Sequence, residues 1–158
     1  MRQRVEARGA DVTIAPLVAA DHDQWAPLWR GYLDFYRASI DEATWRVTFA
    51  RLTGGSEPMG AFLARDAEGA PIGLAHWIAH RSCWTTGDYC YLQDLYVAGG
   101  RRGGGVGRKL IEAVTDKAKA LGCSRVHWLT HETNLEAMGL YDRVAERPGV
   151  VQYRILFV

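Results

Sequence analysis

The chain has 158 residues, 48% of them hydrophobic, a size and composition typical of one globular domain with its own core. Its 19 basic and 18 acidic residues leave a net charge of +1, so no overall field favours nucleic acid or an anionic membrane. No apolar run reaches about 18 residues and no leader pattern is present, which predicts a cytoplasmic protein. We expect residues 1–10 to form a flexible tail and residues 11–158 a single domain.

The three cysteines predict free thiols. Cys83, Cys90 and Cys123 are odd in number and include no C-x-x-C pair. This pattern favours buried thiols over disulfides, and no His-rich spacing accompanies it, so we expect no metal site.

The first third of the chain predicts a short strand over residues 12–17 and then an aromatic helix. The helix begins after an acidic segment that can cap it. Its aromatic residues keep helical spacing, but they form a wider apolar face than a small helix usually buries. Trp25 fits core packing against a partner helix. For Tyr32, Phe35 and Tyr36 two interpretations stay open, which are the same packing or the wall of a substrate pocket.

A second helix and two strands follow. Ser39 and Glu42 are spaced as a capping box, so the second helix is predicted to start there and to end at the glycines at 54 and 55. Residues 61–65 and 72–80 read as strands joined by a hairpin-type turn.

Two histidines lie on one face of the second of these strands. His76 and His80 are four residues apart, so strand alternation points them the same way, about 13 Å from each other. That separation is too large for one shared metal ion. Such histidines are usually hydrogen-bonded or at the rim of a site, and catalysis is the less common role. We therefore treat His76 as a candidate substrate-binding residue.

In the stretch from Tyr91 to Leu121 a predicted strand, a glycine-rich turn and a helix follow one another directly. Residues 91–97 predict a largely buried strand whose only charged member is Asp94. Residues 99–107 are mostly glycine and include two arginines, so backbone N–H groups can approach a ligand closely. From Val106 an apolar stripe at three- and four-residue steps predicts an amphipathic helix.

The glycine loop therefore sits at a helix N-terminus, where free N–H groups and the helix dipole favour a phosphate. A dinucleotide fingerprint fails, because counting from Gly103 puts Arg108 at its third glycine. A triphosphate-binding loop also fails, because no Lys-Ser or Lys-Thr pair follows Gly107. The spacing that fits is R-x-x-G-x-G, spelled by Arg102, Gly105 and Gly107. A glycine-rich connection without a ligand is the alternative, against which strand, spacing, arginine and helix agree.

The last third predicts a strand, a helix and a strand. Residues 124–130 read as a buried strand, and a capping box of Thr133 and Glu136 predicts a short helix from Asn134. A Pro-Gly turn then leads into an apolar last strand over residues 150–158.

Both the loop and the order of elements resemble the GCN5-related N-acetyltransferase (GNAT) family, over the chain from about residue 12 onward. A second signature of that family, N-x-x-A-x-x-L-Y, is matched by Asn134, Ala137, Leu140 and Tyr141. The resemblance implies an α/β (α+β) fold with a mixed, mostly antiparallel sheet of six to seven strands, a splayed central pair and about four helices. The sequence is most similar to the histone and polyamine acetyltransferase branch and its bacterial relatives.

The resemblance also implies which residues bind acetyl-CoA. Backbone groups of Leu95, Tyr96 and Val97 would pair with the pantetheine arm, Asn134 would touch the cofactor, and Tyr141 would protonate the departing thiolate. The pyrophosphate would be held by the glycine loop, which comprises Arg102, Gly103, Gly104, Gly105, Val106 and Gly107.

The reaction implied is direct attack of a neutral amine on the thioester. An alkylamine has a pKa of about 10.4, so a base or a water chain must collect its proton. Asp94 is the first candidate base, and its alternative role is that of a buried, hydrogen-bonded aspartate. Polyamine-acetylating relatives often have a glutamate where this chain has Gln93, which cannot accept a proton. A covalent acetyl-cysteine route is the rival, but no cysteine has a suitably spaced base.

Three functions remain from the sequence alone. The first is acetyl-CoA-dependent acetylation of a primary amine on a small molecule or a protein lysine, and the second is a non-catalytic acyl-CoA-binding module of the same fold. A nucleotide-binding function is a third possibility that predicts ATP rather than CoA as ligand. Because the family commonly pairs through its C-terminal strands, the resemblance also implies a homodimer.

Overall fold

The structure is a computed structural model that describes residues 11–157, so the tail expected over residues 1–10 lies outside the described residues. Two short 3-10 turns, η1 (Ala19–Asp21) and η2 (Gly99–Arg101), accompany the regular elements. In chain order these elements are β1 (Thr13–Pro16), α1 (His22–Phe35), α2 (Glu42–Gly54), β2 (Met59–Arg65), β3 (Pro71–His80), β4 (Tyr89–Val97), α3 (Val106–Ala120), β5 (Val126–His127) and α4 (Leu135–Val144).

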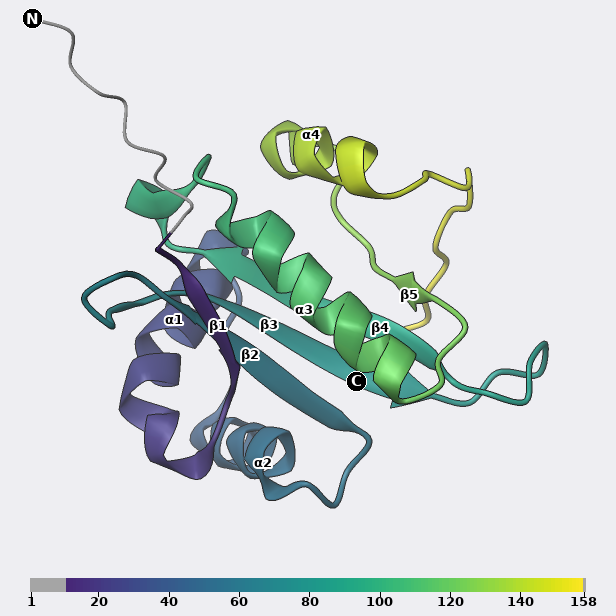
Figure 1. Ribbon diagram of the computed structural model, residues 1–158. Coiled ribbons are helices and arrows are strands. Elements are labelled where there is room, and N and C mark those ends of the chain that lie inside the picture. Colours follow the sequence, from purple (N-terminus) through teal and green to yellow (C-terminus); the bar gives the residue numbers. More distant parts are fainter. Residues whose placement is uncertain (1–10, 158) are drawn as a thin grey trace, which may run out of the picture.

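The strands form one mixed sheet with helices on both faces. Its strand order is β1-β2-β3-β4-β5; the first four strands pair antiparallel and β5 runs parallel to β4. Helices α1 and α2 cover one face, and α3 and α4 lie over the other (Figure 1). The expected α+β architecture is confirmed, although the described residues form five strands where six to seven were expected.

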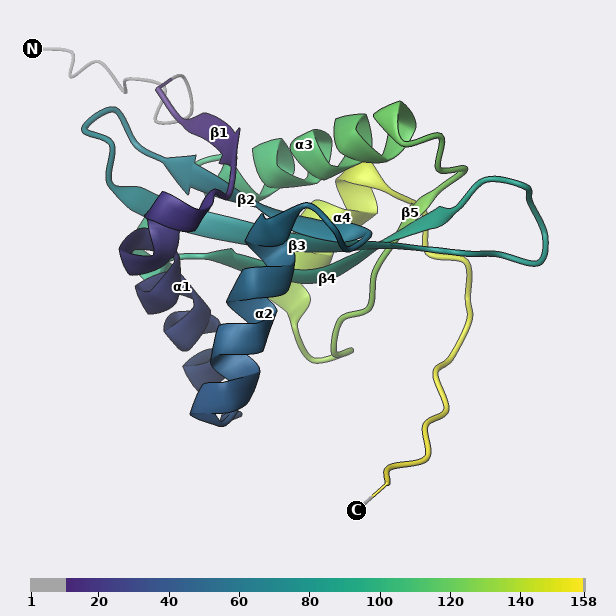
Figure 2. The same ribbon diagram turned by 90° about the horizontal axis from the view of Figure 1, so that it is seen from below.

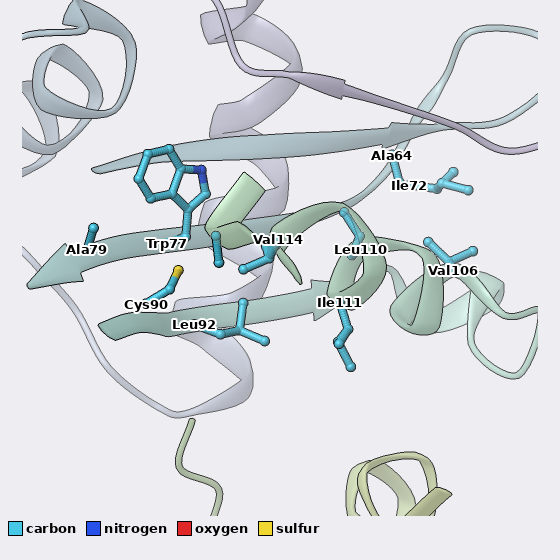
Figure 3. Packing of buried hydrophobic residues seen from close by; sticks show 12 residues of the cluster. Ala64, Ile72, Trp77, Ala79, Cys90, Leu92, Val106, Leu110, Ile111 and Val114 are labelled. Carbon is cyan, nitrogen blue, oxygen red and sulfur yellow. The ribbon is translucent and has the colours of Figure 1, made fainter. Parts of the chain in front are cut away.

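Helix α3 forms as its apolar period predicts, and it buries one stripe on the sheet. Val106, Leu110, Ile111, Val114 and Ala118 are all buried, and they recur at helical spacing. They pack against the small and apolar residues of β3 and β4 that point to this face, such as Trp77, Cys90 and Leu92 (Figure 3). This packing fixes the start of α3, and with it the glycine loop, against the end of β4.

The opposite face is packed by α1 and α2. Trp25 is fully buried and Trp29 nearly so, with Leu28 and Leu33 beside them. Burying each such side chain stabilises the fold by about 1.5–3 kcal/mol. The capping-box prediction for α2 is wrong by two residues, because Asp41 is the cap and its carboxylate accepts from the Thr44 N–H at 2.6 Å. Asp41 forms the more favourable cap because it stands directly before the first helical residue.

Strand β4 contains a β-bulge that changes which side chains face α1. His76 pairs with Asp94, but the next residue of β3, Trp77, pairs with Leu92, so Gln93 is the extra residue. An extra residue reverses the alternation of side chains along the strand. Leu92 consequently packs toward α3 while Asp94 faces α1 beside His76, and Gln93 is exposed.

The C-terminal third departs most from expectation. The strand predicted over residues 124–130 is reduced to the two residues of β5, and it is not buried. Asn134, not Thr133, is the N-cap of α4, and its side chain makes no capping bond.

The last strand, predicted over residues 150–158, is absent from the described residues. Residues 150–157 have no regular secondary structure, and Figure 2 shows them leaving the body of the protein in an extended arm. Their apolar side chains are 71 to 95% exposed. A strand needs a neighbour for its backbone hydrogen bonds, and this arm has none within the described part of the chain.

Two smaller findings complete the fold. All three cysteines are free; Cys90 is buried as expected, but Cys83 is exposed. Burial raises the pKa of the Cys90 thiol to about 11, so this sulfur stays protonated at neutral pH. Among residues 11–157 no helix is long and apolar enough to cross a membrane.

Candidate active site

A cavity of about 300 Å³ opens where the ends of α1 and β4 meet the starts of α3 and α4. Its size is at the lower end of that of small-molecule sites. Its wall is formed by Tyr32, Phe35, Tyr36, Leu95, Tyr96, Val97, Arg101, Arg102, Gly103, Gly105, Val106, Gly107, Arg108, Asn134, Glu136, Ala137, Leu140, Tyr141 and Arg143.

One end of the cavity is suited to an anion. Gly105 is the N-cap of α3 with φ of 82°, and Gly103 has φ of 81°, a region that glycine enters without strain. These turns bring the first N–H groups of α3 to the cavity, together with the positive end of the helix dipole. The cavity is lined by Arg101, Arg102 and Arg108, which lie in the loop and at the start of α3, and by Arg143 of α4.

Two of these arginines are held by partners in the fold. Arg101 donates to the Asp66 carboxylate at 2.6 Å, and backbone N–H groups of the same turn hold that carboxylate from the other side. These N–H donors, led by that of Ala70, and the nearby guanidinium keep the pKa of Asp66 below its usual value. Arg102 donates from Nε to the carbonyl of Val97 at 3.1 Å. The pyrophosphate-loop candidates are therefore attached to the β2-β3 turn and to β4.

The edge of β4 that faces the cavity is open. Strand β5 pairs with β4 only at Cys90 and Tyr91, so among the described residues no strand pairs with this edge from Leu92 to Val97. Strands β4 and β5 therefore splay apart beyond Tyr91, as expected. Backbone groups of Leu95 to Val97 can consequently hydrogen-bond an extended ligand.

The cavity also has an aromatic wall, and the guanidinium group of Arg102 lies 5.1 Å from the centre of the Phe35 ring. Tyr141 of α4 packs edge-on against Trp128, with ring centroids 5.4 Å apart. Burial and then the neighbouring Tyr36 raise the pKa of Tyr141 to about 12, so its hydroxyl is protonated at neutral pH. Tyr36, whose pKa is raised by burial, lies beside the side chain of Asn134. The phenol of Tyr141 is thus available as a proton donor inside the cavity.

Behind the α1 wall lies a buried polar group. Asp94 is 8% exposed and His76 3%, and the His76 Nδ1 to Asp94 Oδ2 distance is 2.9 Å. On its other side, His76 Nε2 accepts from Trp25 Nε1 at 2.9 Å. Tyr32, which lines the cavity, also lies beside Asp94, and burial followed by this carboxylate raises the pKa of Tyr32 strongly.

Most of the residues predicted from sequence line this one cavity. Three do not. Gly104 faces a neighbouring hollow, and Asp94 and His76 lie behind Tyr32. Both interpretations of the aromatic helix apply to different residues, since Trp25 is in the core while Tyr32, Phe35 and Tyr36 form the cavity wall. No cluster of three or more His, Cys, Asp or Glu within residues 11–157 is placed to hold a metal ion.

Sequence analysis missed several residues of the site. Two of them, Glu136 and Arg143, share a helix face with Leu140 of the second signature at three- and four-residue spacing, a signal that could have placed them at the site. Arg108 directly follows the last glycine of the loop. No local pattern points to Trp25 as the partner of His76, since 51 positions separate them.

Comparison with known proteins decides the family. The profile of the Acetyltransferase (GNAT) family matches residues 25–145. The chain belongs to the GNAT acetyltransferase family. It is 35% identical to the D-amino-acid N-acetyltransferase HPA3 of Saccharomyces cerevisiae over 144 residues, which are 90% of this chain and 89% of the yeast protein. This GNAT chain is therefore an enzyme of the N-acetyltransferase class.

A second relative is matched over a shorter length. The thialysine N-epsilon-acetyltransferase of Sus scrofa is 38% identical over 96 residues, 61% of this chain and about half (51%) of that protein. Solved structures share the GNAT fold. They include the ribosomal-protein-alanine N-acetyltransferase of Brucella melitensis, with a TM-score of 0.78 and 23% identity over 92% of this chain and 99% of that one.

A second solved structure of this fold contains a CoA compound. AAC(6')-Iy in complex with a CoA bisubstrate analogue has a TM-score of 0.79 and 18% identity, over 94% of this chain and all of that one (100%). In the present chain both GNAT signatures converge on the cavity. Arg102, Gly105 and Gly107 lie at its cationic end, and all four residues of the second signature line it on the α4 side.

Proposed function

We propose that this GNAT enzyme transfers the acetyl group of acetyl-CoA to a primary amine of a small molecule, with both substrates bound at once. A single observation carries the proposal, namely that one cavity joins an anion-binding loop, an open strand edge and a buried phenol. A pyrophosphate, an amide-containing arm and a thiolate leaving group need these three features in that order. Residues 11–158 are proposed to act as one domain.

The donor would occupy the loop and the strand edge. The residues from Arg102 to Gly107 would hold the pyrophosphate, and backbone groups of Leu95, Tyr96 and Val97 would pair with the pantetheine arm. Asn134 would help to orient the cofactor near the thioester. The guanidinium groups around the loop support an anionic ligand at this end. They leave the aromatic end for the acceptor.

The acceptor would reach the thioester along the aromatic wall. Tyr32, Phe35 and Tyr36 form an apolar surface beside Asp94, the only carboxylate of the network behind it. Aromatic faces and a carboxylate together favour an ammonium group. The names of the two relatives, a D-amino-acid N-acetyltransferase and a thialysine N-epsilon-acetyltransferase, direct the search to amino acids with a primary amine.

The reaction would be a direct displacement. The amine nitrogen attacks the thioester carbonyl, the C–N bond forms, and the C–S bond breaks. The proton lost by the nitrogen goes to the side of Asp94, the proposed base, and the thiolate takes a proton from Tyr141. Holding both substrates in one cavity supplies much of the rate, because attack becomes effectively unimolecular.

The test is release of CoA from acetyl-CoA across a panel of amines. The panel holds D- and L-amino acids, thialysine, spermidine and a lysine peptide, with CoA affinity measured in parallel. We expect turnover on at least one free amino acid or small amine. Tight CoA binding without turnover on any amine would support the non-catalytic acyl-CoA-binding module instead. Protection of the protein by ATP but not by CoA would support nucleotide binding.

We also propose that the protein is a homodimer that exchanges its C-terminal arms. The arm carries an unbroken apolar face, Val151, Tyr153, Ile155 and Phe157, that is exposed along its whole length. Strand β5 is an edge strand of only two residues, so a neighbouring copy has a free edge to join. Exchange of an identical segment is a common route to symmetric dimers.

A further inference from the structure

Three buried side chains form a chain of hydrogen bonds, and the proposed reaction gives a role to only one of them, Asp94. Trp25 of α1, His76 of β3 and Asp94 of β4 are linked in that order by two bonds of 2.9 Å each. All three are at least nine-tenths buried. Tyr32, about two helical turns beyond Trp25, lies beside the same carboxylate and also lines the cavity.

The indole fixes the protonation state of the imidazole. Trp25 Nε1–H can only donate, so His76 Nε2 must be bare to accept from it. A neutral imidazole with a bare Nε2 carries its proton on Nδ1, and that N–H donates to Asp94 Oδ2. A doubly protonated His76 would set its Nε2–H against the indole N–H. The bonds therefore keep His76 neutral and leave the negative charge of Asp94 uncancelled.

The same bonds exclude His76 as the catalytic base. Both of its nitrogens are occupied, and no part of it lines the cavity. Asp94 does not line the cavity either, whereas Tyr32 lines it and lies beside that carboxylate. A proton leaving an amine in the cavity thus meets Tyr32 before it meets Asp94.

We propose that Tyr32 is a catalytic residue that relays the amine's proton to Asp94, and that Trp25 and His76 are positioning residues that keep Asp94 anionic. The inference rests on the proposed function and deepens it. After the nitrogen has attacked the thioester it carries a positive charge, and its N–H is far more acidic than that of the free ammonium. The nitrogen gives this proton to the Tyr32 oxygen while the Tyr32 proton moves to Asp94. Tyr32 is neutral before and after.

The groups that titrate around His76 are few, which makes its protonation measurable. Asp94 faces it from β4, and Tyr32 of α1 lies beside that carboxylate. Tyr36 and Tyr91 lie near Tyr32 and Asp94, and burial raises the pKa of both, so they stay neutral below pH 10. Strand β2 presents only Ala61 opposite His76.

Replacing the indole tests the positioning role through a pH profile. In Trp25→Phe the Nε2 atom of His76 loses its donor, so the imidazole can bind a second proton at low pH and cancel the charge of Asp94. We expect the ratio of kcat/KM, variant over wild type, to be level at alkaline pH and to fall at least about ten-fold as the pH is lowered into the acid range, because a second proton on His76 cancels the charge of Asp94. Taking the ratio removes the ionisation of the substrate itself.

Trp29→Phe is the matched control. Trp29 is on the same helix, is buried to a similar degree and stacks on Trp25, but within the described residues its Nε1 has no hydrogen-bond partner. Its kcat/KM ratio should be level over the whole range. A level ratio in Trp25→Phe, or an equal fall in both variants, would overturn the positioning role. ¹⁵N NMR of the folded wild type gives an independent readout without turnover, and a protonated Nε2 on His76 at pH 7 would also overturn it.

Two further variants test the relay and its support. Tyr32→Phe should lower kcat by about 10²-fold, within the range for general acid–base catalysis, and leave CoA affinity within about two-fold. His76→Asn, whose amide can donate where Nδ1 does, should rescue most of the activity that His76→Leu loses. An active wild type with undiminished kcat in Tyr32→Phe would refute the relay alone. A wild type that acetylates no amine, with the His76 tautomer as stated, would refute the proposed function instead.

Discussion

Tyr141 owes its proposed chemistry to where α4 places it. A phenol in water has a pKa of about 10, and burial raises that of Tyr141 to about 12. The departing thiolate of CoA resembles that of cysteine, whose thiol has a pKa of about 8.5. The higher pKa makes Tyr141 a poorer acid. Its phenol is nevertheless fully protonated at every physiological pH and lies in the cavity. Its availability, not its acidity, makes it a suitable donor.

Tyr141→Phe should therefore slow the chemical step and little else. We expect kcat to fall by about 10²-fold, with CoA affinity within about two-fold of wild type, because only the hydroxyl is removed. Steady-state kinetics and equilibrium CoA binding check both numbers. Wild-type activity should also show no loss from Tyr141 ionisation between pH 7 and pH 10. A variant with unchanged kcat would contradict the role of this residue.

At the residue scale, the sequence predicted what is encoded locally. Arg102 and Tyr141 belong to short signatures whose spacing is readable in one dimension, and both line the cavity. The hydrogen bond between Trp25 and His76 joins residues 51 positions apart, and no pattern in either segment predicts it. Asp94 could be singled out as a carboxylate in a buried strand. The face of the sheet to which its side chain points, however, depends on the bulge at Gln93. Bulges arise from the pairing of two strands and leave no mark in one of them.

At the element scale, the glycine loop determines where α3 begins relative to the cavity. The left-handed backbone of Gly105 turns the chain so that the first N–H groups of the helix face the cavity. A residue with a Cβ in that conformation costs about 1–2 kcal/mol. The loop therefore couples helix geometry and anion binding through one dihedral angle.

Gly105→Ala should weaken both stability and donor binding. We expect a loss of about 1–2 kcal/mol in the free energy of unfolding and a several-fold higher KM for acetyl-CoA, because the strain shifts the N–H groups of the first turn. Gly100→Ala is the control, since Gly100 has open space around its Cα, as Gly105 has, but no positive φ. Urea denaturation and initial-rate kinetics on both variants give the comparison. Equal behaviour of the two would contradict the importance of this backbone conformation.

Elements with their own amphipathic pattern were predicted well, and edge strands were not. The apolar stripe of α3 and the alternation of β3 arise within each segment, so their positions follow from sequence. Residues 124–130 and 150–158 have the composition of strands but lack partners along most of their length. Strand formation at an edge depends on a neighbour, and here the neighbour is proposed to be a second copy of the chain.

At the scale of the whole molecule, the buried tyrosines predict how stability depends on pH. The folded-state pKa of Tyr141 is about 12, above the unfolded value of 10.0, and that of Tyr32 is also raised. Between the unfolded and folded values the unfolded chain releases protons that the folded chain keeps, so the free energy of unfolding falls as pH rises. The stability is fully present below pH 10 and declines through pH 12.

The expected decline from Tyr141 is at most about 3 kcal/mol, because a tenfold difference in proton affinity between the folded and unfolded chain is equivalent to about 1.4 kcal/mol. Urea denaturation at pH 9, 10 and 11, followed by tryptophan fluorescence, measures it. Tyr141→Phe removes one of the titrating groups, so its free energy of unfolding should depend less steeply on pH over the same range. A variant as pH-sensitive as the wild type would contradict this assignment of the decline.

The exposed C-terminal arm predicts how the protein assembles. Along residues 150–157 one face is wholly apolar and the other includes Gln152 and Arg154, which is the pattern of a strand with one buried face. We expect the full chain to be a dimer by light scattering and a chain ending at Gly149 to be a monomer. Pairing of an exchanged arm with β5 would also extend that strand toward residues 124–130.

A matched pair of charge substitutions separates arm exchange from association elsewhere. Ile155→Glu and Gln152→Glu each add one negative charge to the arm, but only the first lies on its apolar face. Burying an unpaired carboxylate is costly, so Ile155→Glu should raise the dimer dissociation constant at least about ten-fold, equivalent to about 1.4 kcal/mol, while Gln152→Glu leaves it within a factor of about two. Dilution series followed by light scattering give both constants. A full-length monomer, or a dimer indifferent to Ile155→Glu, would show that the arm has another partner.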